Sequence, residues 1–177
     1  KMQWALWYAE KLNFSVIPIV PGEKKPLVRW EPYQKQKASA DQIRQWWTKT
    51  PNANIGIVTG AISDLAVIDI DNDEGRKNIE PYLPDSFLTP IVHTPRGGLH
   101  YYCRNTPGLT NKAGLIPGTD FRGEGGYIVA PVSANGNGKA YRWADVGIGN
   151  TPLMPLPEAY IKKINSTIDM RGAWFAQ

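Results

Sequence analysis

Hydrophobic positions in the first third of the chain change from helical to strand-like spacing and back. Apolar side chains recur near helical spacing over residues 2–13, and a β-rich run over residues 15–20 ends at a proline–glycine turn. Ser39 resembles an N-cap, because Gln42 follows three residues later, and it predicts a second helix that ends at Pro51. Helices and strands therefore alternate in this region.

Strand-like runs separated by glycine- and proline-rich turns dominate the rest of the chain. Residues 55–59 and 65–71 are predicted as buried strands, and a helix is predicted over residues 74–82. Further strands are predicted over residues 91–94, 99–104, 127–132 and 140–143, and Pro157 opens a last helix. A β-α-β arrangement followed by consecutive strands predicts an α+β (mixed α/β) domain.

Composition favours one folded domain. The 177 residues are 42% hydrophobic and include seven Trp and eight Tyr, enough for a sizeable core. Cys103 is the only cysteine, which excludes an internal disulfide and a multi-cysteine zinc site and fits a reducing, cytoplasmic setting. No apolar run approaches the ~18 residues of a membrane-spanning helix, so no membrane partner is expected.

The net charge of +4 is unevenly distributed. Residues 21–50 hold seven basic side chains against three acidic ones, whereas residues 61–80 hold six acidic side chains against two basic ones. A basic flank beside an acidic centre suits a polyanion held on one side and metal ions on the other. A solvated charged surface around an ordinary core explains the same pattern.

Two carboxylates, Asp69 and Asp71, stand on the predicted strand at residues 65–71. An Asp-x-Asp pair on a strand projects to one face, and Asp120 supplies a third acid further along the chain. Such oxygen ligands are preferred by Mg²⁺ or Mn²⁺. Alternatively, Asp69 and Asp71 are a strand-end pair that makes turn contacts, and Asp120 is an ordinary loop aspartate. The apolar residues expected to bury the other face are Val67, Ile68 and Ile70.

The segment around His100 offers groups that suit a phosphate. Gly97 and Gly98 allow close backbone approach, so their amides are candidates for phosphate contact, and an ordinary hairpin turn is the alternative. His100 is predicted to face the pocket of the carboxylates and to donate to a triphosphate oxygen, unless it is a structural histidine. Arg96 is either a cationic contact or a solvated turn residue.

Three further basic residues are candidates for phosphate binding. Arg122 lies two residues after Asp120 and shares its face if the segment is extended; a salt bridge to Glu124 or to one of the carboxylates is the alternative. Lys24 and Lys25 lie in a basic loop, where they either bind a triphosphate or template backbone or remain a solvated pair.

Six short motifs follow one another along residues 5–165. They are Gly22-x-Lys24-Lys25-Pro26, Ile43-x-x-Trp46-Trp47, Asn54 to Gly60, Val67 to Asp71, Thr94 to Tyr102, and Asp120 to Pro131. Their order resembles that of bifunctional DNA primase/polymerase (prim-pol) domains of the archaeo-eukaryotic primase superfamily. The ordered set is far more specific than an isolated Asp-x-Asp.

This resemblance implies a primase-like catalytic core with an RRM-like antiparallel sheet and an N-terminal α/β unit. The implied domain is residues 1–165, with an N-terminal lobe at 1–60 and a metal-binding core at 61–165; residues 166–177 would be a linker or the start of a following domain. The implied metal ligands for two divalent ions, Mg²⁺ or Mn²⁺, are Asp69, Asp71 and Asp120, and the implied catalytic set adds His100.

The implied activity is template-directed nucleotidyl transfer to a 3′-hydroxyl, as in a DNA primase or DNA polymerase acting in replication or repair. Its partners would be a single-stranded or primed DNA template and dNTPs, NTPs or both. Because the chain begins with Lys1 rather than Met, we expect a piece of a larger protein. The resemblance implies that this protein is a replication protein of a plasmid, phage or mobile element. A helicase or a primase C-terminal domain is the candidate neighbour.

One departure from the family pattern and two other functions bear on this interpretation. Related primases often carry Ser where this chain has Gly98, which puts a hydroxyl contact to phosphate in doubt. A nucleic-acid-binding module that has lost catalysis is the first alternative, and the intact acids and His100 argue against it. A metal-dependent phosphohydrolase is the second, because Asp-x-Asp after an apolar strand also occurs where an aspartate is phosphorylated.

Overall fold

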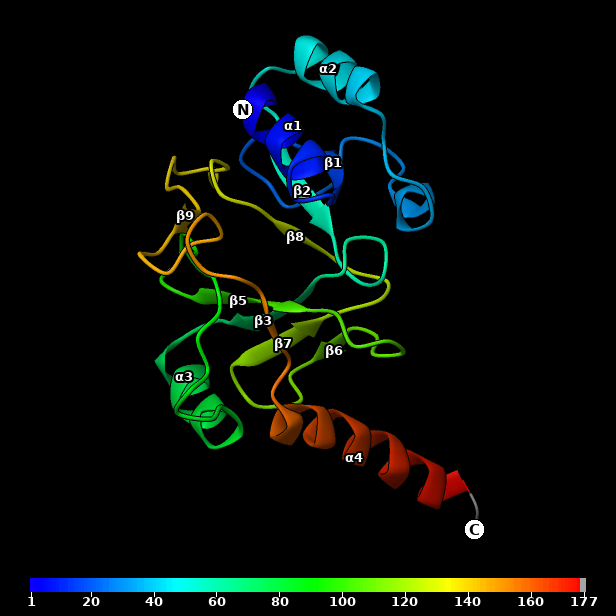
Figure 1. The fold of residues 1–177 in the computed structure, drawn as a ribbon, viewed down its shortest axis with the longest axis vertical. Helices are drawn as coiled ribbons and strands as arrows, with labels where there is room; N and C mark the ends of the chain where they lie inside the picture. Colours follow the sequence, from blue (N-terminus) through cyan, green and yellow to red (C-terminus); the bar gives the residue numbers. More distant parts are fainter. Residues whose placement is uncertain (176–177) are drawn as a thin grey trace.

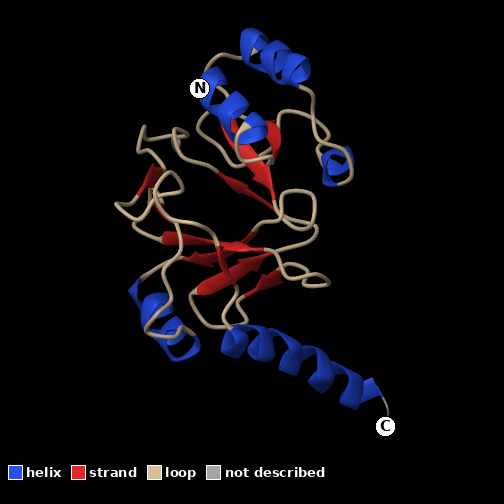
Figure 2. Cartoon of the chain, in the orientation of Figure 1, coloured by secondary structure: helices blue, strands red, loops and turns tan. Residues whose placement is uncertain are grey.

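Two sheets, antiparallel except for the parallel pair of β5 and β10, lie one above the other along the long axis of the molecule (Figure 1). This computed structural model describes the backbone of residues 1–175 and the side chains of residues 1–166. The smaller sheet has the strand order β1-β2-β8, and the larger, seven-stranded sheet has the order β6-β7-β3-β5-β4-β9, with β10 paired to β5. Helices lie mainly at the two ends, with the sheets between them (Figure 2).

The helices are α1 (Met2–Glu10), α2 (Ala40–Lys49), α3 (Asp73–Ile79) and α4 (Glu158–Phe175), with short 3₁₀ turns at Glu31–Gln34 and Glu80–Tyr82. The strands are β1 (Ser15–Ile19), β2 (Asn54–Val58), β3 (Ala66–Ile70), β4 (Ile91–His93), β5 (Leu99–Arg104), β6 (Lys112–Ala113), β7 (Thr119–Arg122), β8 (Tyr127–Val129), β9 (Arg142–Trp143) and β10 (Met154–Pro155). The predicted α+β class is confirmed.

The N-terminal helices cover the smaller sheet, whose first two strands are entirely buried. The Ser39 hydroxyl accepts a hydrogen bond from the Gln42 amide at the start of α2, which confirms the predicted cap. Trp47 anchors α2 because its indole N–H donates to the Ala53 carbonyl (3.1 Å) while its ring is buried. Strand β8 pairs with β2, so this sheet is not built from residues 1–60 alone.

The larger sheet separates two hydrophobic cores because side chains along β3 alternate between its faces. Val67 packs into the core shared with the N-terminal helices, together with Val92. Ile68 and Ile70 pack into the other core, which α3 and α4 cover. The expectation that Val67 would share a face with Ile68 and Ile70 was wrong, because Val67 and Asp69 are two residues apart and lie on the same face.

Several element boundaries differ from the sequence prediction. The predicted helix at 74–82 tightens to a 3₁₀ turn after Ile79, where Pro81 lacks the N–H that an α-helix needs. Strands β6, β7 and β10 were not predicted. Helix α4 continues into residues 166–177, the segment assigned to a linker or a following domain; that assignment remains a prediction. None of the described helices combines the length and hydrophobicity needed to cross a membrane.

Truncation of a side chain on the face opposite Asp69 should affect stability strongly. Ile68 is fully buried, so Ile68→Ala is expected to lower the free energy of unfolding by about 2–5 kcal/mol through lost burial and a residual cavity. Leu88→Ala is the control, because Leu88 is 57% exposed and a change below about 0.5 kcal/mol is expected. Urea unfolding measures both; equal losses would contradict the assignment of Ile68 to the core.

Candidate active site

Three adjacent strands bring Asp120, Asp69 and His100 into one row. Asp69 on β3 stands opposite His100 on β5 and opposite Asp120 on β7 in the antiparallel register. Opposite residues of an antiparallel pair project to the same face, so all three side chains lie on the side of the sheet that faces the smaller sheet. The register therefore joins three motifs that are separate in the sequence.

Asp71 reaches the same site from the end of β3. Its backbone N–H donates to the Gly118 carbonyl (2.9 Å), which ends the strand beside the turn that leads into β7. The next residue, Asn72, caps α3 by accepting from the Gly75 amide (2.9 Å). Asp71 is thus held between a strand end and a helix start, and its carboxylate is exposed.

Within the row of three side chains, Nε2 of His100 lies 3.3 Å from Oδ1 of Asp69. The two side chains are only 7% and 18% exposed, so the contact is largely shielded from water. The other ring nitrogen of His100, Nδ1, is buried and has no hydrogen-bond partner within the described part of the chain. Because a buried polar atom without a partner is costly, His100 retains an unmet capacity for one more hydrogen bond.

The two aspartates of β3 have pKa values shifted in opposite directions. Burial raises the pKa of Asp69, but the hydrogen bond and charge of His100, with the charges of Arg122 and Lys24, outweigh it and leave the pKa below its usual value. Burial and the charges of the two neighbouring aspartates raise the pKa of Asp71. Asp69 is therefore ionised near neutral pH. The charge repulsion at Asp71 is what a nearby cation would relieve.

The carboxylate of Asp120 is engaged within the protein. Its Oδ2 lies 3.2 Å from Nη2 of Arg122, and its Oδ1 accepts from the Gly114 amide at 2.9 Å. Arg122 thus forms the salt bridge to a carboxylate that the sequence allowed, while Glu124 instead accepts from the Ala61 amide. Among the described side chains, no three His, Cys, Asp or Glu residues are grouped as a metal site.

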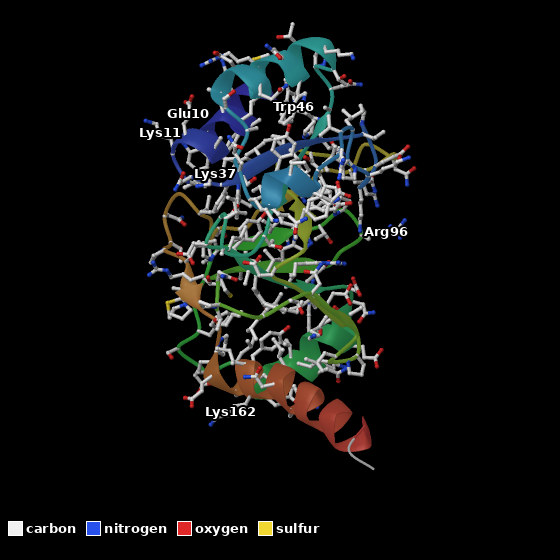
Figure 3. The ribbon with its side chains drawn as sticks, turned by 90° about the vertical axis from the view of Figure 1, so that its right-hand side faces the viewer. Glu10, Lys11, Lys37, Trp46, Arg96 and Lys162 are labelled. Atoms are coloured by element: carbon white, nitrogen blue, oxygen red, sulfur yellow. The ribbon has the colours of Figure 1, made fainter. Side chains whose placement is uncertain are left out.

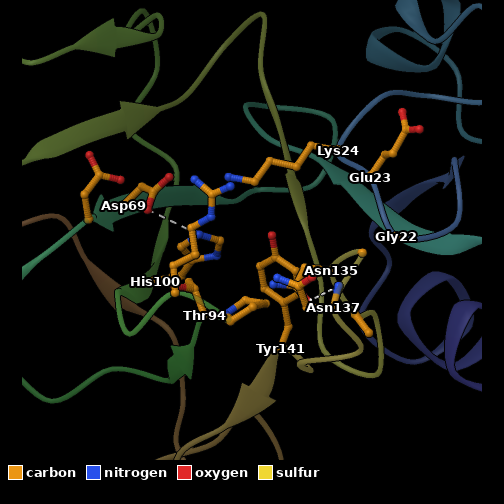
Figure 4. A pocket seen from close by; sticks show the side chains of 14 residues that line it. Gly22, Glu23, Lys24, Asp69, Thr94, His100, Asn135, Asn137 and Tyr141 are labelled. Atoms are coloured by element: carbon orange, nitrogen blue, oxygen red, sulfur yellow. Dashed lines mark hydrogen bonds and ion pairs between the residues drawn. The ribbon is translucent and has the colours of Figure 1, made fainter.

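A cavity of about 690 Å³ opens over these residues (Figure 4). Asp69, Asp71 and His100 line it, with Lys24 opposite. The Lys24 loop approaches the loop that begins at Asn135, because Gly22 and Asn135 form an isolated β-bridge. A smaller cavity of about 170 Å³ continues toward Arg122. The volume of the larger one suits a small polar ligand such as a nucleotide.

The basic residues predicted to contact phosphate do not all line the same cavity. Lys24 and Arg96 line the larger cavity, and Arg122 lines the smaller one. Lys25 is exposed and lines neither cavity. The basic groups nearest to the carboxylates are therefore Lys24, Arg96 and Arg122.

The amides of Gly97 and Gly98 are occupied within the β4–β5 turn. The Gly97 amide donates to the Thr94 carbonyl (3.1 Å), and the Gly98 amide donates to the Thr94 hydroxyl (3.0 Å). A Cβ at Gly98 would lie 2.3 Å from the Ile70 carbonyl oxygen, so no serine fits there without a shift of β3. The glycines shape the turn before His100, and this geometry does not favour a phosphate contact through their amides.

The structure adds residues that the sequence did not indicate. Tyr141 lines both cavities and lies 6.1 Å from His100 between ring centroids, and burial together with the charge of Asp69 raises its pKa to about 12. Asn135 and Asn137 line the outer wall. No periodic pattern or motif marks these positions, because only tertiary packing brings their loop to the carboxylates.

A methyl group at Gly98 should destabilise the turn before His100. Gly98→Ala is expected to lower the free energy of unfolding by about 1–3 kcal/mol, because the obstructing atom is backbone and cannot rotate away. Gly149→Ala is the matched control, since nothing lies within 4 Å of its added Cβ. Thermal unfolding compares them, and equal stability of the two variants would refute the close approach.

In metal-free buffer, Asp69→Asn and Asp71→Asn should shift stability in opposite directions near neutral pH. The ionised form of Asp69 stabilises the fold, so Asp69→Asn should lower the free energy of unfolding by about 1–2 kcal/mol. The ionised form of Asp71 disfavours the fold, so Asp71→Asn should raise it by less than about 1 kcal/mol, since exposed charges are screened.

The stability changes caused by Asp69→Asn and Asp71→Asn should both vanish in acid, although over different pH ranges. The stabilisation from Asp69 is lost as the pH falls through its depressed folded-state pKa. The penalty from Asp71 disappears once the pH falls below the ordinary aspartate pKa, about 3.9, where both states are protonated. Urea unfolding at a series of pH values measures this, and shifts of the same sign at neutral pH would contradict the assigned electrostatics.

The sequence was compared with protein families and with curated proteins. Residues 5–159 match the family described as "Bifunctional DNA primase/polymerase, N-terminal", which spans the whole row of Asp69, His100 and Asp120. The curated proteins gave no match. Because the match covers most of the chain, this protein belongs to the bifunctional DNA primase/polymerase family and carries its N-terminal domain.

Proposed function

We propose that the chain is a template-directed nucleotidyltransferase, a DNA primase or DNA polymerase that joins a nucleotide to a 3′-hydroxyl. Family membership supports a primase- or polymerase-type activity that binds nucleic acid and nucleotides. The observation that carries the proposal is the row in which Asp69 contacts His100 on the floor of a cavity that also holds Asp71 and Lys24. Acidic and basic side chains line the same cavity there, so one side can bind a metal ion and the other the phosphates of a triphosphate.

The donor set of the cavity fits a divalent cation. Asp69 and Asp71 offer hard carboxylate oxygens to one cavity, and the raised pKa of Asp71 reflects a repulsion that a cation relieves. We assign these two as ligands of Mg²⁺ or Mn²⁺; when bound, such an ion would neutralise charge on the leaving pyrophosphate and favour ionisation of the 3′-hydroxyl. Asp120, the third proposed ligand, is paired with Arg122, so its participation, and that of a second ion, requires this ion pair to open.

The remaining residues are assigned to the triphosphate. Lys24 and Arg96 supply positive charge at the cavity wall, and Arg122 supplies it at the smaller cavity. His100 contacts Asp69 through Nε2, and with both ring nitrogens protonated its Nδ1–H would donate to a phosphate oxygen. The buried ring of Tyr141 limits water at this side of the cavity.

We further propose single-stranded or primed DNA as the template and dNTPs, NTPs or both as substrates. The reaction would serve replication or repair within a larger prokaryotic, plasmid, phage or mobile-element protein. Neither Tyr101 nor Tyr102 is placed as a sugar contact, because Tyr101 packs on Phe87 and Tyr102 is fully buried.

A second candidate is a nucleic-acid-binding module of the same fold without catalysis. One observation favours it: Asp120 is already neutralised by Arg122, so the described acids do not close around one point. This candidate predicts strand binding without nucleotide incorporation.

Primer extension tests the proposed function. The wild-type chain should extend a labelled primer on a DNA template with dNTPs and Mg²⁺ or Mn²⁺. Asp69→Ala/Asp71→Ala should reduce extension by more than about 100-fold, since even indirect partners of metal ligands contribute 10- to 100-fold. The charge-matched control is Asp85→Ala/Asp145→Ala, which removes two exposed acids outside the cavity and should extend normally.

The outcomes separate the functions. Equal extension by the wild type and Asp69→Ala/Asp71→Ala would refute the assigned site. Strand binding without extension by the wild type would favour the binding module. Release of inorganic phosphate rather than pyrophosphate would identify the phosphohydrolase instead. Template-dependent dinucleotide synthesis without a primer would add priming to extension.

A further inference from the structure

A third cavity, of about 770 Å³, opens beside the two cavities of the candidate active site. It is lined by His93, Thr94, Pro95, Arg96, Gly97, Lys139, Ala140 and Arg142, and we call it the basic groove. Residues 94–96 also line the cavity of the carboxylates. On the other wall, one loop borders both, because residues 134–137 face the carboxylates and residues 139–140 face the groove. The cavity of the carboxylates and the basic groove therefore adjoin along these two walls.

The groove carries positive charge that no described side chain neutralises by an ion pair. Its lining includes Arg96, Lys139 and Arg142 and no acid. Within the described part of the chain, no side chain forms an ion pair or hydrogen bond with these three cations. Five other arginines do pair with carboxylates: Arg29, Arg44, Arg76, Arg104 and Arg122. Arg96 and Arg142 in the groove therefore differ from these five arginines, because neither has an acidic partner among the described residues.

Both walls of the groove rest on anchored backbone. Arg142 on β9 is the cross-strand partner of His93 on β4, so these two side chains project to one face at the edge of the larger sheet. On the facing loop, the Asn135 side-chain oxygen accepts from the amides of Asn137 and Lys139, both at 3.0 Å. The spacing of the cations is therefore set by the fold.

We propose that the basic groove binds the sugar-phosphate backbone of the single-stranded template beside the reacting centre. This assignment rests on the proposed function, which places the incoming nucleotide in the adjoining cavity. The groove extends beyond that nucleotide-sized cavity, and its cations are exposed and distributed over two walls. Such a track suits successive phosphates of a polymer, whose binding is electrostatic and independent of sequence.

Oligonucleotide binding without catalysis tests the groove. Fluorescence anisotropy of a labelled oligodeoxythymidylate in EDTA, over a series of KCl concentrations, should show about 5- to 30-fold weaker binding for Lys139→Ala/Arg142→Ala. The slope of log affinity against log salt should fall in magnitude by about 1.4, since each single-strand phosphate contact contributes about 0.7.

The matched control is Lys11→Ala/Lys49→Ala, which removes the same charge from exposed positions at the C-terminal ends of α1 and α2. Figure 3 places Lys11 on the opposite side of the view from Arg96. Circular dichroism and thermal unfolding confirm that each variant is folded. The control should bind like the wild type; an equal loss in both variants would mean that net charge alone drives binding and would overturn the proposal.

Two further results would also overturn it. One is unchanged oligonucleotide binding by Lys139→Ala/Arg142→Ala. The other is weakened binding of a fluorescent nucleoside triphosphate with oligonucleotide binding intact, which would make the groove a nucleotide subsite. Because no metal or nucleotide is present in the strand-binding assay, its failure leaves the primer-extension result untouched, and a failure of extension leaves the groove result interpretable.

Discussion

The register of β3 between β5 and β7 is the constraint on which the site depends. It places Asp69 opposite both His100 and Asp120, so one backbone ladder fixes the lateral positions of two acids and an imidazole. A slip by one residue would turn Asp69 into the core that α3 and α4 cover, and would turn Ile68 or Ile70 toward the cavity. The two hydrophobic cores, one on each face of the larger sheet, make that slip costly.

The close approach at Gly98 supports this register. With no Cβ at that position, the start of β5 comes within reach of the Ile70 carbonyl, and the Thr94 side chain closes the turn by accepting from the Gly98 amide. On its outer side, the Gly97 carbonyl accepts from the Arg76 guanidinium (2.9 Å), which ties the turn to α3. The turn that precedes His100 is therefore positioned by strand, helix and side chain together.

Acidic and basic side chains reach the cavity from different elements of the fold. The acids belong to the central strands, whereas Lys24 and Arg96 reach the cavity from loops at its wall. Where acid and base meet within the protein, as in Asp120 and Arg122, the charges cancel. Where they do not, the raised pKa of Asp71 and the unpaired cations of the basic groove mark sites suited to a cation and to phosphates, respectively.

The sequence by itself determined the α+β class, the cap of α2 and the family, because these follow from local periodicity and ordered motifs. It did not indicate β7, whose four residues include two charged side chains, or that Tyr141 and the loop around Asn135 line the cavity. Only the tertiary structure decided that Arg122 pairs with Asp120 and that the amides of the glycine turn are occupied. These outcomes depend on long-range strand pairing and loop packing, which local sequence patterns do not encode.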